Sequence, residues 1–211
     1  MGTLDHWQIF GRSKLSIANE GALGTKNSFL STRRKVPAEG LMQELVVKCL
    51  TEGVRLEVNA WIKLYENGTP FTCDKTARYG QPKACPVISI KFMVPSAPKG
   101  FSWLHIANDD PFGWKPNEFN QHRGNFVITS EMTTSTEAYL YVYGVNGGID
   151  MLVDKVTLRP YEPPKTSCDQ LIRNGDAEVS ITALALNFIT FSLLQTFLNL
   201  YNLFGFLESS S

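Results

Sequence analysis

The sequence has no excess of charge of either sign. Its 20 Lys and Arg residues balance 20 Asp and Glu residues, so the formal net charge at pH 7 is 0. Proteins that bind nucleic acid neutralise phosphates with clustered basic residues, and the densest basic group here is the short run Arg33–Lys35. We therefore expect no nucleic-acid partner.

Motifs of common catalytic and zinc sites are also absent. The sequence contains no GxSxG, HExxH or P-loop motif and no pair of cysteines spaced for zinc. The neighbouring carboxylates Asp109 and Asp110 stand beside Pro111, which is typical of a turn, whereas the two carboxylates of a glycosidase stand on opposite sides of a bond. We therefore expect that the protein is not an enzyme.

A signal peptide is missing too, because Met1–Trp7 has neither a basic start nor an apolar run. In contrast, residues 181–207 carry no charged side chain and are rich in Leu, Phe and Ile, so this segment is long enough to span a bilayer. Asn and Gln side chains within it argue against a span, because amides are costly in hydrocarbon. The segment is either a membrane anchor or translated non-coding sequence.

What the sequence does contain is an unbroken alternation of apolar and polar residues over Val54–Leu64. Successive side chains of a strand face opposite sides, so this pattern predicts a long strand with one buried face. The other face carries Trp61 and Asn59 among charged residues. An aromatic ring among polar groups is a first indication of a binding surface.

Similar short segments recur along the chain, separated by turns with Gly and Pro and by a long polar loop over residues 108–123. About eight short strands at regular spacing, with no amphipathic helix between them, predict an all-β fold, an antiparallel β-sandwich or jelly roll. The segments are 12–17, 28–32, 42–47, 54–64, 87–94, 101–106, 124–129, 138–143 and 150–158.

The predicted sandwich occupies residues 1–160, and a stiff Pro-rich linker over 161–167 follows it. Residues 168–180 either begin a second repeat or fold back as a strand. Residues 181–211 form an apolar tail, which we expect to be helical.

Of the four cysteines, Cys73 and Cys85 flank a polar segment between two predicted strands, as the ends of a hairpin-closing disulfide would. The alternative is two free thiols. A disulfide would imply an oxidising compartment. The sequence does not show how Cys49 and Cys168 pair.

Several short motifs follow one another in a familiar order. They are Trp7, Arg33 or Arg34, Gly40 with Gln43, Asn59–Lys63, Gly124–Phe126 and Asp150–Val156. With these motifs, residues 3–160 resemble the carbohydrate-binding modules of families 4, 9 and 22, which are galactose-binding-like jelly rolls. The resemblance implies a non-catalytic module that binds polysaccharide. It implies ligand contacts at Tyr141, Tyr143, Arg34 and Gln43.

The opening motif of such modules is missing before Trp7, yet a similar run, Asn174–Glu178, stands beyond the predicted sandwich and linker. This arrangement is typical of a tandem array whose first module is truncated, or of a circular permutation. The modules often hold a structural Ca²⁺, a hard cation that prefers oxygen ligands. The resemblance implies such an ion at Asp154, with Glu178 as a second ligand if it folds back. Otherwise Asp154 is a surface carboxylate.

Sugars stack their apolar faces on aromatic rings, while polar side chains bind their hydroxyl groups. Three sets of residues meet this requirement if their strands share one sheet. A stripe of Tyr on a sandwich is also typical of a partly buried structural face, and Trp61 and His105 can equally be structural. The three sets are Tyr139, Tyr141 and Tyr143; Trp61 with Asn59; and Trp103 with His105.

The sequence therefore predicts binding of a polysaccharide or oligosaccharide in an aromatic and polar groove, by part of a larger extracellular or cell-surface protein. One alternative is an adhesion or structural jelly roll that binds protein, which is favoured if the three Tyr side chains are buried. Another is an appended module of a glycoside hydrolase fragment.

Overall fold

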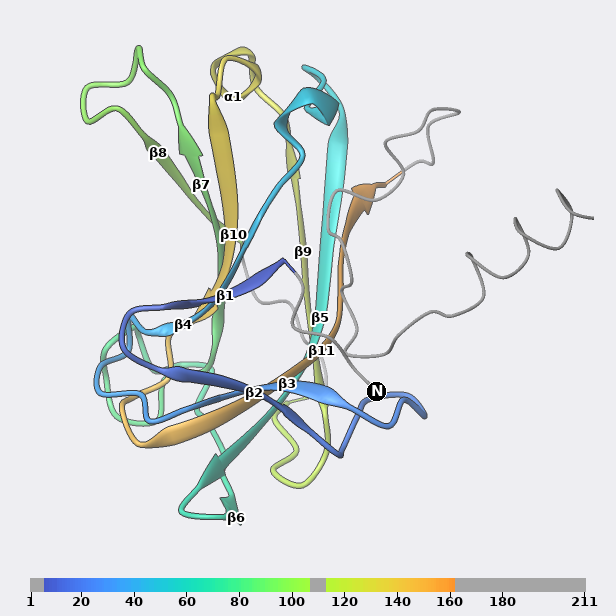
Figure 1. Cartoon of the computed structure of the whole chain (residues 1–211), viewed down its shortest axis with the longest axis vertical. Helices are drawn as coiled ribbons and strands as arrows, with labels where there is room; N and C mark the ends of the chain where they lie inside the picture. The colour runs from blue at the N-terminus through green and yellow to red at the C-terminus, as the bar shows by residue number, and fades with distance from the viewer. Residues whose placement is uncertain (1–5, 107–112, 162–211) are drawn as a thin grey trace, which may run out of the picture. The chain divides into compact units, whose positions relative to one another are not determined.

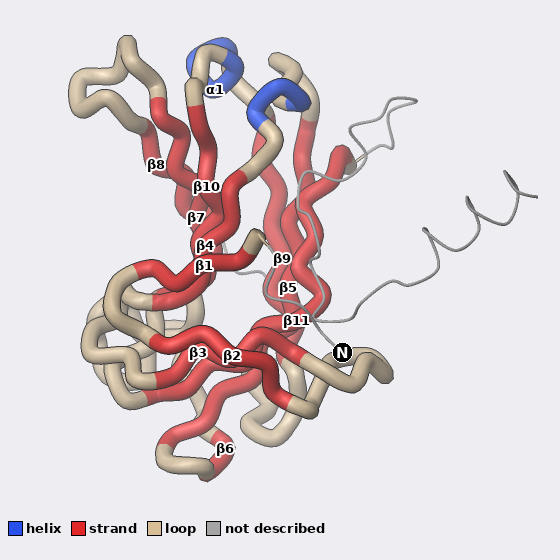
Figure 2. Tube along the Cα trace, viewed as in Figure 1, coloured by secondary structure: helices blue, strands red, loops and turns tan. Residues whose placement is uncertain are grey.

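The computed structural model describes residues 6–106 and 113–161, all of which belong to the first of two units into which the chain divides, Met1–Glu178. The described residues form eleven strands in two antiparallel sheets (Figures 1 and 2). The predicted antiparallel β-sandwich is therefore confirmed. Residues 162–211, and with them the predicted linker, second repeat and apolar tail, lie outside the described part.

Sheet A has five strands in the spatial order β1-β4-β10-β7-β8. In that order its strands are Trp7–Phe10, Gly40–Glu44, Glu137–Tyr143, Val87–Met93 and Ser102–Ile106. Strands far apart in the sequence are therefore neighbours, as in Greek-key and jelly-roll connections.

Sheet B has the order β2-β3-β11-β5-β6, and β9 pairs with β5 beside this path. Two short helices, η1 (Val47–Cys49) and α1 (Ser130–Thr133), complete the described elements. In the order of the sheet, with β9 last, the strands are Lys14–Ala18, Ser28–Thr32, Ile149–Pro160, Arg55–Glu66, Thr69–Pro70 and Asn120–Val127.

Strand β5 is the long strand that the alternation predicts. It pairs along its length with β11 and with β9. Burial of one such aliphatic side chain contributes about 1.5–3 kcal/mol to folding, so the buried face of β5 is a large part of the core. The side chains of that face are almost fully buried, and they are Leu56, Val58, Ala60, Ile62 and Leu64.

The core lies between the inner faces of the two sheets. Sheet A supplies Leu41, Ile90 and Leu140, and sheet B supplies the β5 residues, Phe29 and others to the same apolar cluster. Trp7 of β1 packs on Phe29 of β3, with ring centroids 5.1 Å apart. This contact joins the edge of sheet A to sheet B.

Two predicted boundaries are wrong. The polar loop expected over residues 108–123 ends earlier, because β9 begins at Asn120. Its inward-facing residues Asn120 and His122 are polar but buried. A strand whose buried face carries polar residues lacks the apolar alternation, so the sequence pattern does not reveal where it begins. Strand β1, Trp7–Phe10, lies before 12–17, the first segment that the sequence predicts as a strand.

In the described part of the chain, no helix has the length and apolar character needed to cross a membrane. The proposed membrane segment, residues 181–207, lies outside that part.

Candidate functional site

The outer face of sheet A carries most of the aromatic side chains that the sequence marks as candidates. On β10, Ala138, Leu140 and Val142 are fully buried in the core, so Tyr139, Tyr141 and Tyr143 lie on the opposite, outer face. The strand register shows which residues lie beside these Tyr side chains, because residues paired across two strands lie on the same face of the sheet. Tyr141 pairs with Ser89, and Ser89 with His105. Tyr139 pairs with Lys91, and Lys91 with Trp103.

The rings on this face contact one another. Tyr141 lies between Phe10 and Trp103, with centroid distances of 4.8 Å and 5.1 Å. Trp103 and His105 are nearly parallel, with 7° between the ring planes and 6.3 Å between centroids. We call this set of rings the aromatic face; its members are Phe10, Tyr79, Trp103, His105, Tyr139, Tyr141 and Tyr143.

A cavity of about 590 Å³ opens on the aromatic face. Its lining residues come from four strands and two loops that lie between β1 and β10 in the sequence. The cavity therefore forms only when these distant segments have packed together. Gly40 of β4 pairs with Phe10 and lies beside Tyr143, where an added Cβ would collide with the backbone of Val142. The lining residues are Phe10, Ala38, Tyr79, Val87, Trp103, His105 and Tyr143.

A chain of hydrogen bonds crosses the floor of this face. The Ser89 hydroxyl lies 2.9 Å from Nδ1 of His105 and 3.2 Å from the hydroxyl of Tyr143. Ser89 is fully buried, so it is no accessible nucleophile, and its contact with His105 holds the imidazole in place. The arrangement supplies polar atoms within a largely aromatic surface.

Tyr139 stands at the other end of the Tyr stripe. Its hydroxyl donates a 2.7 Å hydrogen bond to the carboxylate of Glu137. This bond, together with the negative charge, favours the neutral phenol and raises the pKa of Tyr139 to about 12. Burial raises the pKa of the Tyr141 hydroxyl as well. Both groups are therefore hydrogen-bond donors at neutral pH.

The three Tyr side chains differ in exposure. Tyr141 and Tyr143 are only 5% and 8% exposed, and neighbouring rings of the aromatic face cover them. Trp103 is 37% exposed, and His105 is exposed too. The surface that a ligand can touch is therefore formed by Trp103, His105 and the exposed Tyr79, with the buried rings of Tyr141 and Tyr143 as support.

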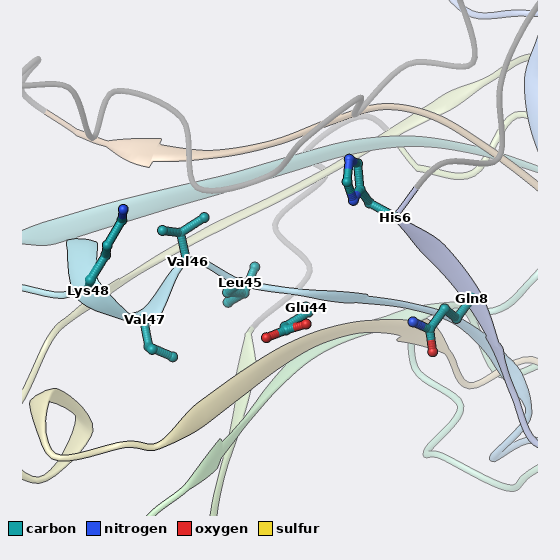
Figure 3. A pocket seen from close by; sticks show the side chains of 7 residues that line it. All are labelled: His6, Gln8, Glu44, Leu45, Val46, Val47 and Lys48. Carbon is teal, nitrogen blue, oxygen red and sulfur yellow. The ribbon is translucent and has the colours of Figure 1, made fainter.

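A second pocket, of about 330 Å³, lies beside the aromatic face. Figure 3 shows that its side chains come from two places, the start of β1 and the continuous segment Glu44–Lys48. His6 and Gln8 supply the first, and Glu44 of this segment pairs with Tyr139 across β4 and β10. The pocket offers an amide, a carboxylate and an ammonium group next to the Tyr stripe.

Arg34, a predicted ligand contact, lies elsewhere. Its side chain is 2% exposed, and its guanidinium donates to the carbonyl oxygens of five residues. Burial lowers the pKa of Arg34 to about 10, although the nearby Glu39 opposes this shift. Arg34 is thus a residue that ties two loops together, and its burial removes it from ligand contact. The carbonyls belong to Pro37, Glu39, Val145, Asn146 and Ile149.

Gln43 is also placed away from the aromatic face. It is 1% exposed and pairs with Leu140 and Trp7, whose side chains point into the core. Because paired residues share a face, Gln43 lies on the inner side of sheet A. It does not contribute to the groove.

Trp61 and Asn59 lie on the outer face of sheet B, because the β5 residues between them and beside them point into the core. Asn59 accepts a 2.8 Å hydrogen bond from the side chain of Gln121, and Trp61 pairs with Asp154 on β11. The single groove that the sequence predicts from all three sets is therefore wrong for Trp61 and Asn59. Trp103, His105 and the Tyr stripe do share sheet A.

Asp154 is buried, so its interpretation as a surface carboxylate is wrong. One oxygen accepts hydrogen bonds from the amide of Ala22 (2.7 Å) and the hydroxyl of Thr25 (2.5 Å), and the other from the amide of Lys155 (2.8 Å). N–H groups satisfy a carboxylate but cannot ligate a cation. Among residues 6–106 and 113–161, no group of three or more His, Cys, Asp and Glu side chains could hold a metal ion. Asp154, the predicted Ca²⁺ ligand, is thus hydrogen-bonded to protein donors, and its predicted partner Glu178 lies outside the described residues.

The disulfide between Cys73 and Cys85 is present, with 4.9 Å between the Cα atoms. The prediction of this bridge is confirmed. None of the cysteines in the described part of the chain is a free thiol.

Comparisons by sequence find no matching family model and no matching curated protein. Comparisons by structure do find matches. The CBM22-1 xylan-binding domain of Paenibacillus barcinonensis Xyn10C superimposes with a TM-score of 0.55 and 14% identity, over 76% of this chain and 88% of that one. The C-terminal family 22 carbohydrate-binding module of Clostridium thermocellum Xyn10B gives 0.57 and 15%, over 76% and 88%.

This chain has the jelly-roll fold of these modules. A third match is the CBM22-1–GH10 segment of Clostridium thermocellum Xyn10B in complex with xylohexaose, with a TM-score of 0.54 and 19% identity, over 74% of this chain and 26% of that one. At such identities the likeness establishes the fold.

Sequence reasoning missed two members of the aromatic face, Phe10 and Tyr79, and the buried Ser89 that is hydrogen-bonded to His105 and Tyr143. Phe10 belongs to a strand that the hydrophobic pattern does not reveal. Ser89 and Lys91 are the polar residues that alternate with apolar ones in Val87–Met93, and the outward position of Ser89 was a usable signal. Tyr79 lies in the polar loop between Cys73 and Cys85, where nothing local indicates that it reaches sheet A.

Proposed function

We propose that the protein binds a polysaccharide or oligosaccharide, without catalysis, on the aromatic face of sheet A. The observation that carries this proposal is the cavity of about 590 Å³ on that face, lined mainly by aromatic rings. Xylan-binding is part of the name of two structures with this fold, which supports β-linked plant-type or algal polysaccharide as the ligand class.

The geometry suits a sugar. The nearly parallel rings of Trp103 and His105 present flat apolar area at low cost in conformational entropy. The exposed imidazole of His105 and the Tyr139 hydroxyl, which is hydrogen-bonded to Glu137, supply polar atoms for the hydroxyl groups of a sugar. A ligand pocket commonly combines aromatic area with a few such polar groups.

The proposed cellular location and domain context are supported by the disulfide and by one of the structural matches. A disulfide is typical of an oxidising compartment, which supports an extracellular or cell-surface location. One match in the same fold is a module joined to a GH10 module, which supports a role as one part of a multidomain protein. As such a part, the module would tether its neighbours to glycan.

The test is an affinity-gel panel with the full chain and five polymers: xylan, mixed-linkage glucan, a cellulose derivative, laminarin and mannan. We expect at least one polymer to retard the wild-type chain and Trp103→Ala to abolish the retardation. Trp61→Ala is the matched control, because it removes the same side chain from the outer face of sheet B. Absence of retardation from a chain that is folded by circular dichroism would refute the proposal, as would equal loss in both variants.

A second candidate is a structural or adhesive jelly roll that binds protein. The burial of Tyr141 and Tyr143 favours it, since those rings then serve packing. It would be supported by a folded chain that no polymer retards, and excluded as the sole function by retardation that depends on Trp103.

A further inference from the structure

The loop between β6 and β7 crosses from sheet B to sheet A and brings Tyr79 to the aromatic face. β6 pairs with β5 at the edge of sheet B, whereas β7 lies within sheet A between β10 and β8. Between them, Tyr79 lines the cavity together with Trp103, His105 and Tyr143. A side chain from a crossover loop therefore forms one wall of the cavity on sheet A.

Tyr79 is only partly held by the protein. Its ring packs edge-on against Tyr143, with 5.8 Å between centroids, yet the side chain is 53% exposed. Partial burial and the neighbouring Tyr143 raise the pKa of its hydroxyl. The ring of Tyr79 thus contacts the cavity wall at one edge, and much of its remaining surface is accessible to a ligand.

The Cys73–Cys85 disulfide closes the segment of the loop that carries Tyr79. Next to the bridge, the amide of Asp74 donates to the carbonyl of Lys83 over 2.7 Å. Nearer the tip, the side chain and amide of Gln81 form hydrogen bonds of 2.7 Å and 2.9 Å with the backbone of Arg78. Such exposed local bonds contribute little each, whereas a cross-link over a short loop removes much of its freedom.

The start of the loop is fixed by other contacts. Phe71 donates its amide to the carbonyl of Leu64 on β5, and its own carbonyl accepts from the indole of Trp114, both over 2.9 Å. Both cysteines are buried in the core cluster. The sandwich therefore holds the base of the loop, and the disulfide joins the two ends of the segment that carries Tyr79.

We infer that Tyr79 is a ligand-contacting residue, and that the Cys73–Cys85 disulfide holds it in position, so that loss of the bridge weakens polysaccharide binding. This inference rests on the proposed function. The ligand class is the same glycan, with its apolar sugar face against the ring of Tyr79 and another part of it on Trp103.

The experiment measures affinity for the polymer of the five-member panel that most retards the wild-type chain, by affinity gel and by calorimetry on the full chain. The variants are Tyr79→Ala, Cys73→Ser with Cys85→Ser, and all three changes together. Substitution is used because a reductant would act on any other disulfide among the four cysteines. Tyr161→Ala is the matched control, since Tyr161 is 59% exposed and directly follows β11, Ile149–Pro160, of sheet B.

We expect Tyr79→Ala and loss of the bridge each to weaken binding about tenfold. The triple variant should bind no more weakly than Tyr79→Ala, because the bridge acts through Tyr79 and the effects are not additive. Tyr161→Ala should bind as the wild type does. A purely structural bridge would still weaken binding in the Tyr79→Ala background.

The inference is overturned if Tyr79→Ala binds as tightly as the wild type while Trp103→Ala does not, and in that case the proposed function stands. It is also overturned if the wild-type chain binds none of the five polymers, in which case the proposed function fails as well. If the serine variant does not fold, Tyr79→Ala and Tyr79→Phe decide on the ligand contact: binding should weaken about tenfold in the first and stay close to that of the wild type in the second.

Discussion

The outer faces of sheets A and B carry similar side chains, but different structures cover them. On sheet B, the segment between β2 and β3 lies over the strands. Glu20 of this segment forms an ion pair with Lys63 and accepts a hydrogen bond from Tyr65, while Ala22 and Thr25 bind Asp154. On sheet A, the rings of Trp103 and His105 remain exposed beside a cavity of about 590 Å³.

Electrostatics separates the two faces as well. Burial alone would lower the pKa of Lys63, but the hydrogen bonds and charge of Glu20 and Tyr65 outweigh it, so the pKa of Lys63 is raised. Charged groups on sheet B thus satisfy each other inside the protein. The comparison indicates that an outward aromatic or charged residue is available to a ligand only where no loop covers it. Four changes test this difference, from the largest expected effect to the smallest.

Asp154→Ala should lower the free energy of unfolding most. The change leaves the amides of Ala22 and Lys155 and the hydroxyl of Thr25 without their buried acceptor, at an expected cost of about 3 kcal/mol. Urea unfolding measures this cost. Glu66→Ala, an exposed carboxylate on β5, is the control and should change little. Polymer binding by the remaining folded Asp154→Ala chain should be unchanged, and a loss of affinity without a loss of stability would contradict the contrast between the faces.

Arg34→Lys should affect both stability and binding. Lysine keeps the charge but cannot donate in a planar fork to the carbonyls of Pro37, Glu39 and Val145, so we expect a loss of about 2 kcal/mol. The affected loop contains Ala38, which lines the cavity. Urea unfolding and the affinity gel should both respond. Reduced affinity with unchanged stability would instead indicate that Arg34 touches the ligand.

Glu39→Gln should change the pH dependence of stability. Backbone amides of Lys35, Arg12 and Val36 donate to the Glu39 carboxylate and lower its pKa below the ordinary 4.5. A carboxylate with a lowered folded pKa contributes stability above its unfolded pKa, and this contribution is lost as pH falls through the folded pKa. The variant should therefore be less stable at neutral pH and lose less stability during acidification below pH 4.5. Parallel curves for both chains would contradict this.

Glu137→Gln should have the smallest effect. It removes the charge that accepts from Tyr139, so the pKa of that phenol should fall from about 12 toward the ordinary 10.0. The ultraviolet absorbance of phenolate, followed during alkaline titration with Tyr139→Phe as the reference, measures the change. Stability at neutral pH should change by about 0.5 kcal/mol or less, because both side chains lie at the surface. An unchanged titration would show that Glu137 does not set this pKa.

Local patterns were sufficient for much of the fold. The alternation of Val54–Leu64 predicted β5, and that of residues 138–143 predicted both β10 and the outward direction of its Tyr side chains. An alternation of apolar and polar residues predicts these strands because each sheet buries one face in the core and turns the other outward. They failed at Asn120 and His122, which are polar but buried, and at Trp7–Phe10, a short edge strand.

The candidate site was predicted only in part. Trp103, His105 and the Tyr stripe share one sheet as expected. Arg34 and Gln43 have side chains that could bind a ligand, but both are buried in the folded protein. Nothing in the residues next to them in the sequence indicates that burial. Trp61 and Asn59 face outward as predicted, yet they face outward from the other sheet.

By itself, the sequence determined most of the strands, the direction of their side chains and the candidate pair Cys73 and Cys85, because these depend on period, turn residues and short separations along the chain. Only the tertiary structure decided which strands share a sheet and which outer face stays open. That decision depends on long-range pairing such as β10 with β4 and β7, and on loops such as the one that carries Tyr79. Their final positions are set by contacts between residues far apart in the sequence.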